Sequence, residues 1–262
     1  MILNIKILAM KCKALFFFFL MVCSQFAQSQ ELKPEYQKFI STFISEVKNN
    51  NKNAVAARIT FPLNRENPIP SVRNKTEFLK RYNEIFDKTL IDKIVKSNPT
   101  KDWSEVGWRG IMLYQGDLWI DTNGKIISIN YQSDAEKKQK NSLIAAQKKS
   151  VNSSISNFKK PIAILETSKF RIRIDDLGND NYRYASWSIK KKMTDTPDLI
   201  IENGVFFADG TGGNHHYEFK KGNYVYECHF IVLGEDNSPP AQLIITQNDK
   251  TILEQNAKIV SR

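Results

Sequence analysis

The spacing of the apolar residues changes along this chain, and that change limits the folds open to it. Between Leu32 and Ile94, apolar side chains recur every three or four residues, which is typical of helices packed on a core. Toward the C-terminus they alternate instead with polar residues, as in Phe170, Ile172 and Ile174, which is typical of half-buried antiparallel strands. The sequence therefore predicts an α+β protein with a helical first part and an all-β last part.

Three helices are predicted in the first part. The first ends at the asparagine run 49–51, and a short helix follows over residues 54–58. The third begins near residue 74, with Asn74 or Thr76 as its N-cap, and its apolar stripe continues to Ile94.

Two tight hairpins are predicted after the helices, over residues 106–131. Gln115-Gly116 and Asn123-Gly124 are two-residue turn signals, and turns of this length fix which side chains share a face of the sheet. The layer expected under the helices is Arg109, Ile111, Leu113, Leu118, Ile120, Ile127, Ile129 and Tyr131. The opposite face carries Trp108, Met112, Tyr114, Asp117, Trp119 and Asp121.

The order of helices and hairpins, with the segment GIMLYQGDLWID at residues 110–121, resembles an NTF2-like domain over residues 32–132. The resemblance implies a sheet curled around helices to form an apolar pocket. Such folds host isomerases, dehydratases and many non-catalytic binding modules, so the resemblance implies a fold and no activity.

Four segments are predicted. Residues 1–29 form a signal peptide, 30–132 the NTF2-like domain, and 133–160 a charged connector that is helical over about 134–149. Residues 161–262 contain about seven strands separated by turn signals, which predicts an antiparallel β-sandwich or jelly roll. A connector between two independently folded units is also the expected first site of proteolysis.

The N-terminal segment has the three parts of an export signal. Lys6, Lys11 and Lys13 precede an apolar run too short to span a bilayer, and small residues place the cleavage site near Ser29. We expect an exported protein, periplasmic or extracellular, with no stable membrane span. The alternative is a lipoprotein acylated on Cys23.

The net charge of +10 does not point to nucleic acid. Part of it belongs to the signal peptide, and the rest is spread along the chain rather than concentrated in one basic segment. We therefore predict no nucleic-acid partner, and at most a weak attraction to anionic envelope polymers.

The three histidines, His215, His216 and His229, fall in one predicted hairpin. With Lys221-Gly222 as its turn, His216 opposes Glu227 and shares a face with His229. Two imidazoles and a carboxylate could bind a divalent metal ion, although a solvated polar face explains the same pattern. No cofactor is predicted.

A glycine-rich segment runs from Asp209 to Asn214. A phosphate-binding loop needs a helix N-terminus behind it, and this segment leads into a strand. It is predicted to be a flexible loop at the sandwich edge, with Asp209 and Asn214 as ligand candidates.

Catalytic chemistry is not apparent in the first domain. Residues 30–132 contain no histidine, and no general base is evident in the layer under the helices. An inward carboxylate within hydrogen-bond reach of a tyrosine would favour a pocket enzyme instead.

The predicted function is that of an exported, soluble, non-catalytic binding or envelope-interaction protein. A pocket enzyme of isomerase or hydrolase type is the first alternative, and a secreted inhibitor of another protein is the second. The partner is expected to be an unknown protein or a glycan, with a homodimer also open. Trp108, Tyr114 and Trp119, grouped on the outer face of the sheet, are interface candidates because large exposed aromatics require a cover.

Overall fold

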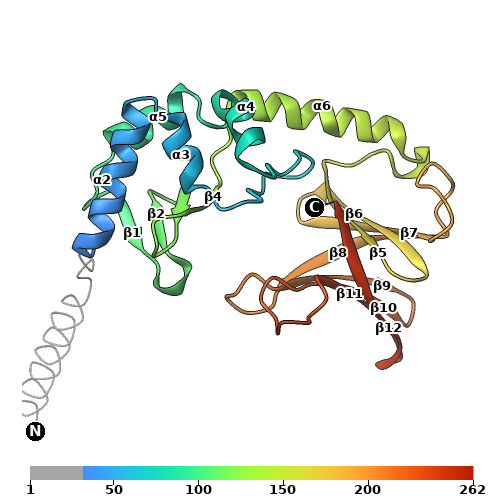
Figure 1. Ribbon diagram of the computed structural model, residues 1–262. Coiled ribbons are helices and arrows are strands. Elements are labelled where there is room, and N and C mark those ends of the chain that lie inside the picture. Colours follow the sequence, from blue (N-terminus) through green and yellow to red (C-terminus); the bar gives the residue numbers. More distant parts are fainter. Residues whose placement is uncertain (1–31, 262) are drawn as a thin grey trace, which may run out of the picture.

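The computed structural model describes residues 32–261, and the predicted signal peptide lies outside them. Figure 1 shows two modules joined by one long helix. The first module has helices and a four-stranded antiparallel sheet, and the second is a closed eight-stranded antiparallel barrel. The α+β class is therefore confirmed, whereas the predicted sandwich or jelly roll is wrong. Along the described part of the chain, no helix is long and apolar enough to cross a membrane.

Four helices build the first module: α2 (Pro34–Lys48), α3 (Lys52–Arg58), α4 (Lys75–Ile85) and α5 (Lys88–Lys96). Asn74 is the N-cap of α4, and its side chain accepts a hydrogen bond from the Glu77 amide. The predicted third helix is in fact two helices. Asp87 accepts a hydrogen bond from the Leu90 amide and so starts α5 as a separate element.

The sheet of this module has the order β1 (Trp103–Glu105), β2 (Ile111–Leu113), β3 (Leu118–Ile120) and β4 (Ile126–Ile129). Leu113 pairs with Leu118, as the hairpin signals predicted. A register shift in the next hairpin pairs Ile120 with Ile126 rather than Ile127. Ile127 is consequently 40% exposed instead of lying under the helices.

A 3₁₀ turn at Gly107–Arg109 interrupts the strand predicted over residues 106–114. Gly110 follows it with φ of 99°, and a Cβ atom there would lie 2.4 Å from the Ile120 carbonyl oxygen. The turn leaves Arg109 exposed, so the prediction that it faces the helices is wrong.

Aromatic side chains fill the space between the helices and the sheet. Phe78, Tyr82 and Phe86 are buried from α4 onward, and the rings of Tyr82 and Phe86 stack with centroids 5.0 Å apart. The sheet contributes Ile111, Leu113, Leu118, Ile120, Ile126 and Ile129 to the same core. The interior of this module is therefore packed with side chains.

The connector helix α6 (Asp134–Ser150) forms where it was predicted, and a short 3₁₀ turn (Ser153–Ile155) follows it. The barrel strands are β5 (Lys160–Glu166), β6 (Phe170–Gly178), β7 (Asn181–Ser188), β8 (Leu199–Ala208), β9 (His215–Lys221), β10 (Tyr224–Phe230), β11 (Ala241–Gln247) and β12 (Lys250–Ser261). Each strand pairs with the next in sequence, and β12 closes the barrel by pairing with β5.

Two strands turn the corners of the barrel. The first part of β8 pairs with β7 and its last part with β9, while β12 pairs first with β11 and then with β5. Asn203 (φ of 61°) and Gly204 lie where β8 changes partner. The Glu202-Asn203-Gly204 turn signal is therefore an irregularity inside one continuous strand.

The barrel interior is filled by large side chains, including Tyr184, Phe219 and Phe230. Cys228 also points inward, and burial raises the pKa of its thiol. The thiol is thus a packing group, protonated at neutral pH.

Gly204→Ala is expected to lower the free energy of unfolding by about 1–3 kcal/mol. A Cβ atom at this position would lie 2.2 Å from Cε1 of the Phe219 ring, so the ring or the strand has to move. Urea denaturation measures the loss. The double variant Gly204→Ala/Phe219→Leu should lose less than the sum of the single losses, and strict additivity would contradict the steric explanation.

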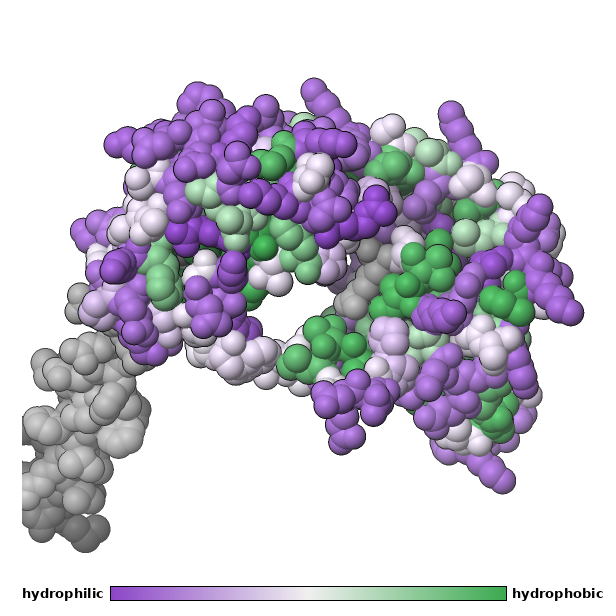
Figure 2. Space-filling view, in the orientation of Figure 1, coloured by the Kyte–Doolittle hydropathy of each residue, from purple (hydrophilic) through white to green (hydrophobic). Residues whose placement is uncertain are grey.

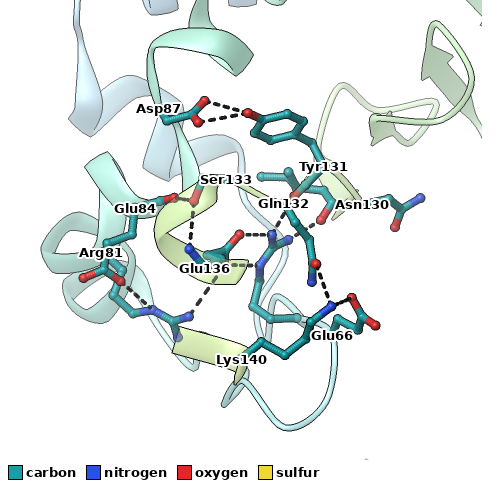
Figure 3. Close-up of polar contacts among 12 residues, drawn as sticks. Glu66, Arg81, Glu84, Asp87, Asn130, Tyr131, Gln132, Ser133, Glu136 and Lys140 are labelled. Carbon is teal, nitrogen blue, oxygen red and sulfur yellow. Dashed lines mark hydrogen bonds and ion pairs between the residues drawn. The ribbon is translucent and has the colours of Figure 1, made fainter. Parts of the chain in front are cut away.

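The start of α6 is anchored in the first module. Figure 2 shows a mostly hydrophilic outer surface over the helices, and Figure 3 shows the polar network beneath it. Ser133 is the N-cap of α6 and accepts a hydrogen bond from the Glu136 amide. Arg65 forms a buried ion pair with Glu136 (Nε to Oε1, 2.7 Å) and also donates to the carbonyl oxygens of Ile129 and Tyr131.

The other end of the connector is docked on the barrel. On the outer face of β6 and β7, Asp175 lies between the guanidinium groups of Arg173 and Arg183, with oxygen–nitrogen distances of 2.7 and 2.8 Å. Arg183 also donates to the carbonyl oxygens of Ile155 and Asn157, just after α6. The connector thus packs against both modules.

A groove of about 640 Å³ separates the loop at residues 64–67 from the barrel. Asn67 bridges it, donating to the carbonyl oxygens of Pro161 (2.9 Å) and Ile162 (3.2 Å). Figure 2 shows an opening between the modules, bordered on the barrel side by hydrophobic side chains.

Candidate functional site at the loop end of the barrel

Two loops lie together at one end of the barrel: residues 209–214 between β8 and β9, and residues 231–240 between β10 and β11. Asn214 joins them. Its Nδ2 donates to the Leu233 carbonyl, and its Oδ1 accepts from the amides of Val232 and Leu233, each at 2.8 Å. The predicted flexible loop is therefore held by its own candidate residue.

The glycines of the first loop allow this contact. A Cβ atom on Gly212 would lie 2.8 Å from Cδ1 of Leu233, and Gly213 has φ of 93° beside Val232. Close approach of the two loops, rather than phosphate binding, explains the glycine-rich composition.

Hydrophobic side chains are exposed around the same end of the barrel. Val232 and Leu233 are 52% and 50% exposed, and we call this pair the loop tip. On β8, residues 205–207 (Val-Phe-Phe) are also exposed, and beyond Gly204 this strand pairs with β9 alone. Single exposed apolar residues are ordinary, but a held loop with two adjacent ones is typical of a docking surface.

The histidine candidates lie on the outer face of the barrel beside the first loop. His216 pairs with His229 rather than with Glu227, because the hairpin turn is Gly222-Asn223. His216 Nδ1 lies 2.9 Å from Asp209 Oδ1, and His229 Nδ1 lies 3.9 Å from Asp209 Oδ2. In the described part of the chain, Asp209, His216 and His229 are the residues grouped closely enough to hold a metal ion.

Sequence reasoning named these residues without bringing Asp209 to the histidines. The segment 209–214 was interpreted as an open loop before a separate strand, whereas β8 and β9 form a hairpin around it. Pairing Phe207 with His216 across the glycines would have placed Asp209 beside the imidazoles. The hairpin was the missed signal.

The aromatic candidates of the first module are divided by the structure. Trp108 is 67% exposed, while Tyr114 and Trp119 are half-buried. Tyr114 donates to the Lys93 carbonyl oxygen (3.4 Å) and does not pair with Asp117 in the sheet. A docking role for this face stays a prediction.

A tyrosine and a carboxylate do meet in the first module, as an enzyme would require. The Tyr131 hydroxyl donates to Asp87, with oxygen–oxygen distances of 2.9 and 3.1 Å. The same Asp87 carboxylate also caps α5 through the Leu90 amide. Its hydrogen bonds serve the start of the helix, so the pair has a structural role.

No protein-family model, no curated protein and no solved structure matches this chain. The argument for function therefore depends on the site itself.

Proposed function

We propose that this chain is an exported, non-catalytic binding protein that docks another protein through the loop end of its barrel. The observation that carries the proposal is the Asn214 clamp, which holds the exposed loop tip in one conformation. A recognition loop that is ordered before binding loses less entropy on association.

The chemistry of the loop end favours a protein partner over a glycan. Its exposed apolar groups are mainly aliphatic at the tip, with Val232 and Leu233 rather than flat rings on which a sugar would stack. Polar residues around them, such as Asp209 and Asp236, supply the rim that protein interfaces have. A secreted inhibitor is one form that such docking takes.

The first module is proposed to be an NTF2-like scaffold rather than an enzyme. Its space between helices and sheet is occupied by Phe78, Tyr82 and Phe86. The Tyr82 hydroxyl is buried there, and desolvation raises its pKa to about 12, so it stays protonated at neutral pH. A filled interior supports the scaffold over the pocket enzyme.

A photo-reactive amino acid at Leu233 should give one discrete covalent adduct in the exported fraction of cells that produce the protein. The same group at Ile252, which is 53% exposed on β12, is the matched control and should give none. Denaturing electrophoresis and mass spectrometry identify the adduct. An adduct between two copies of the chain would identify a homodimer, and identical adducts at both positions would contradict the proposal.

A further inference from the structure

Metal-ligating side chains from two strands and one loop converge on the outer face of the barrel. We propose that Asp209, His216 and His229 form a binding site for a divalent transition-metal ion of the zinc type. One donor atom from each of the three lies within 4.8 Å of the others. The site is independent of protein docking at the loop tip.

The donor spacing suits tetrahedral coordination. Donors bound at about 2.0–2.1 Å in a tetrahedron lie about 3.3 Å apart. The two imidazole–carboxylate distances, 2.9 Å for His216 and 3.9 Å for His229, bracket that value. Small side-chain rotations would therefore bring both Nδ1 atoms and one Asp209 oxygen onto a common ion.

The imidazole rings are already oriented by their neighbours. The Phe207 ring stacks on His216 with centroids 4.9 Å apart, and His216 stacks on His229 at 4.7 Å. His229 Nε2 is shielded from solvent and makes no hydrogen bond within the described residues, and Glu227 Oε2 lies 3.5 Å from it. A carboxylate beside the second ring nitrogen is the usual support of a metal-bound histidine.

The register places like charges opposite each other beside the histidines. Glu218 pairs directly with Glu227, and such pairs are unfavourable in a sheet. Lys220 neutralises Glu218 at 2.8 Å, which leaves Glu227 and Asp209 flanking the two imidazoles. A bound cation would offset this negative charge.

The donor set selects the class of metal. Two imidazole nitrogens with one carboxylate suit zinc and its neighbours among the transition metals, whereas calcium and magnesium prefer all-oxygen sites. Three protein donors leave a further position for water or for a donor from another molecule.

Isothermal titration of the metal-free mature chain with zinc chloride at neutral pH tests the site. We expect saturable binding of one Zn²⁺ per chain, and no saturable binding of Mg²⁺. Glu227→Gln should weaken Zn²⁺ binding by about 10- to 100-fold, as loss of an outer carboxylate does. Asp209→Asn, His216→Ala and His229→Ala should each weaken it at least as much.

His215→Gln is the matched control, because His215 belongs to the same strand but to the opposite face, where its ring stacks on Phe230. It should bind Zn²⁺ like the wild type. Circular dichroism checks that each variant is folded, and absorption of the Co²⁺ form reports tetrahedral coordination directly. Absence of Zn²⁺ binding, or equal affinity in the His216→Ala/His229→Ala double variant, would overturn the proposal.

Discussion

Glu136→Gln is expected to lower the free energy of unfolding by about 3–5 kcal/mol, because it leaves a buried guanidinium without its carboxylate. Arg65 and Glu136 are almost fully buried, with side-chain exposures of 1% and 0%. The amide has nearly the shape of the carboxylate, so the loss reports charge and not volume.

Urea denaturation followed by tryptophan fluorescence and circular dichroism measures this effect as a lower midpoint. Glu84→Gln is the matched control. Glu84 pairs with Arg81 at 3.7 Å, but its side chain is 50% exposed, so its loss should cost less than about 1 kcal/mol. Equal losses in the two variants would show that the ion pair does not anchor α6.

Asp175→Asn should also destabilise the protein by about 3–5 kcal/mol. The Asp175 carboxylate is buried between Arg173 and Arg183, and the variant leaves two guanidinium groups with no anion between them. Those arginines also hold the end of the connector, since the Arg173 guanidinium lies 4.6 Å from the centre of the Phe158 ring. The variant should therefore loosen the connector as well as the barrel.

Two measurements test this second effect. Urea denaturation gives the loss of stability, and limited trypsin digestion gives the rate of cleavage within residues 134–150, which should rise in the variant. Glu166→Gln, which breaks a half-exposed pair with Arg171, is the control and should change neither by much. Unchanged cleavage of the connector in Asp175→Asn would mean that the cluster stabilises the barrel alone.

Local patterns were sufficient for several elements of the fold. The first helix, the connector helix and the pairing of Leu113 with Leu118 follow from apolar spacing and turn residues, which act over a few positions. The histidine hairpin is instructive, because its predicted register was two residues off. His216 and His229 nevertheless share a face, since strand side chains alternate with a period of two.

Other features depended on residues far apart in the chain. Closure of the barrel comes from pairing between β12 and β5, and no local signal distinguishes a closed barrel from two stacked sheets. Asn203-Gly204 has the composition of a turn and became a bend in β8 only because Phe219 packs against it.

The polar clusters show the same division most clearly. The sequence by itself determined which residue types were present: Arg65 and Glu136, Arg173 and Asp175, Asp209 and the two histidines. Only the tertiary structure decided that the first two pairs are buried and that Asp209 lies beside His216. A charged residue has the same letter whether it is solvated or buried, and its environment is set by distant segments that pack around it.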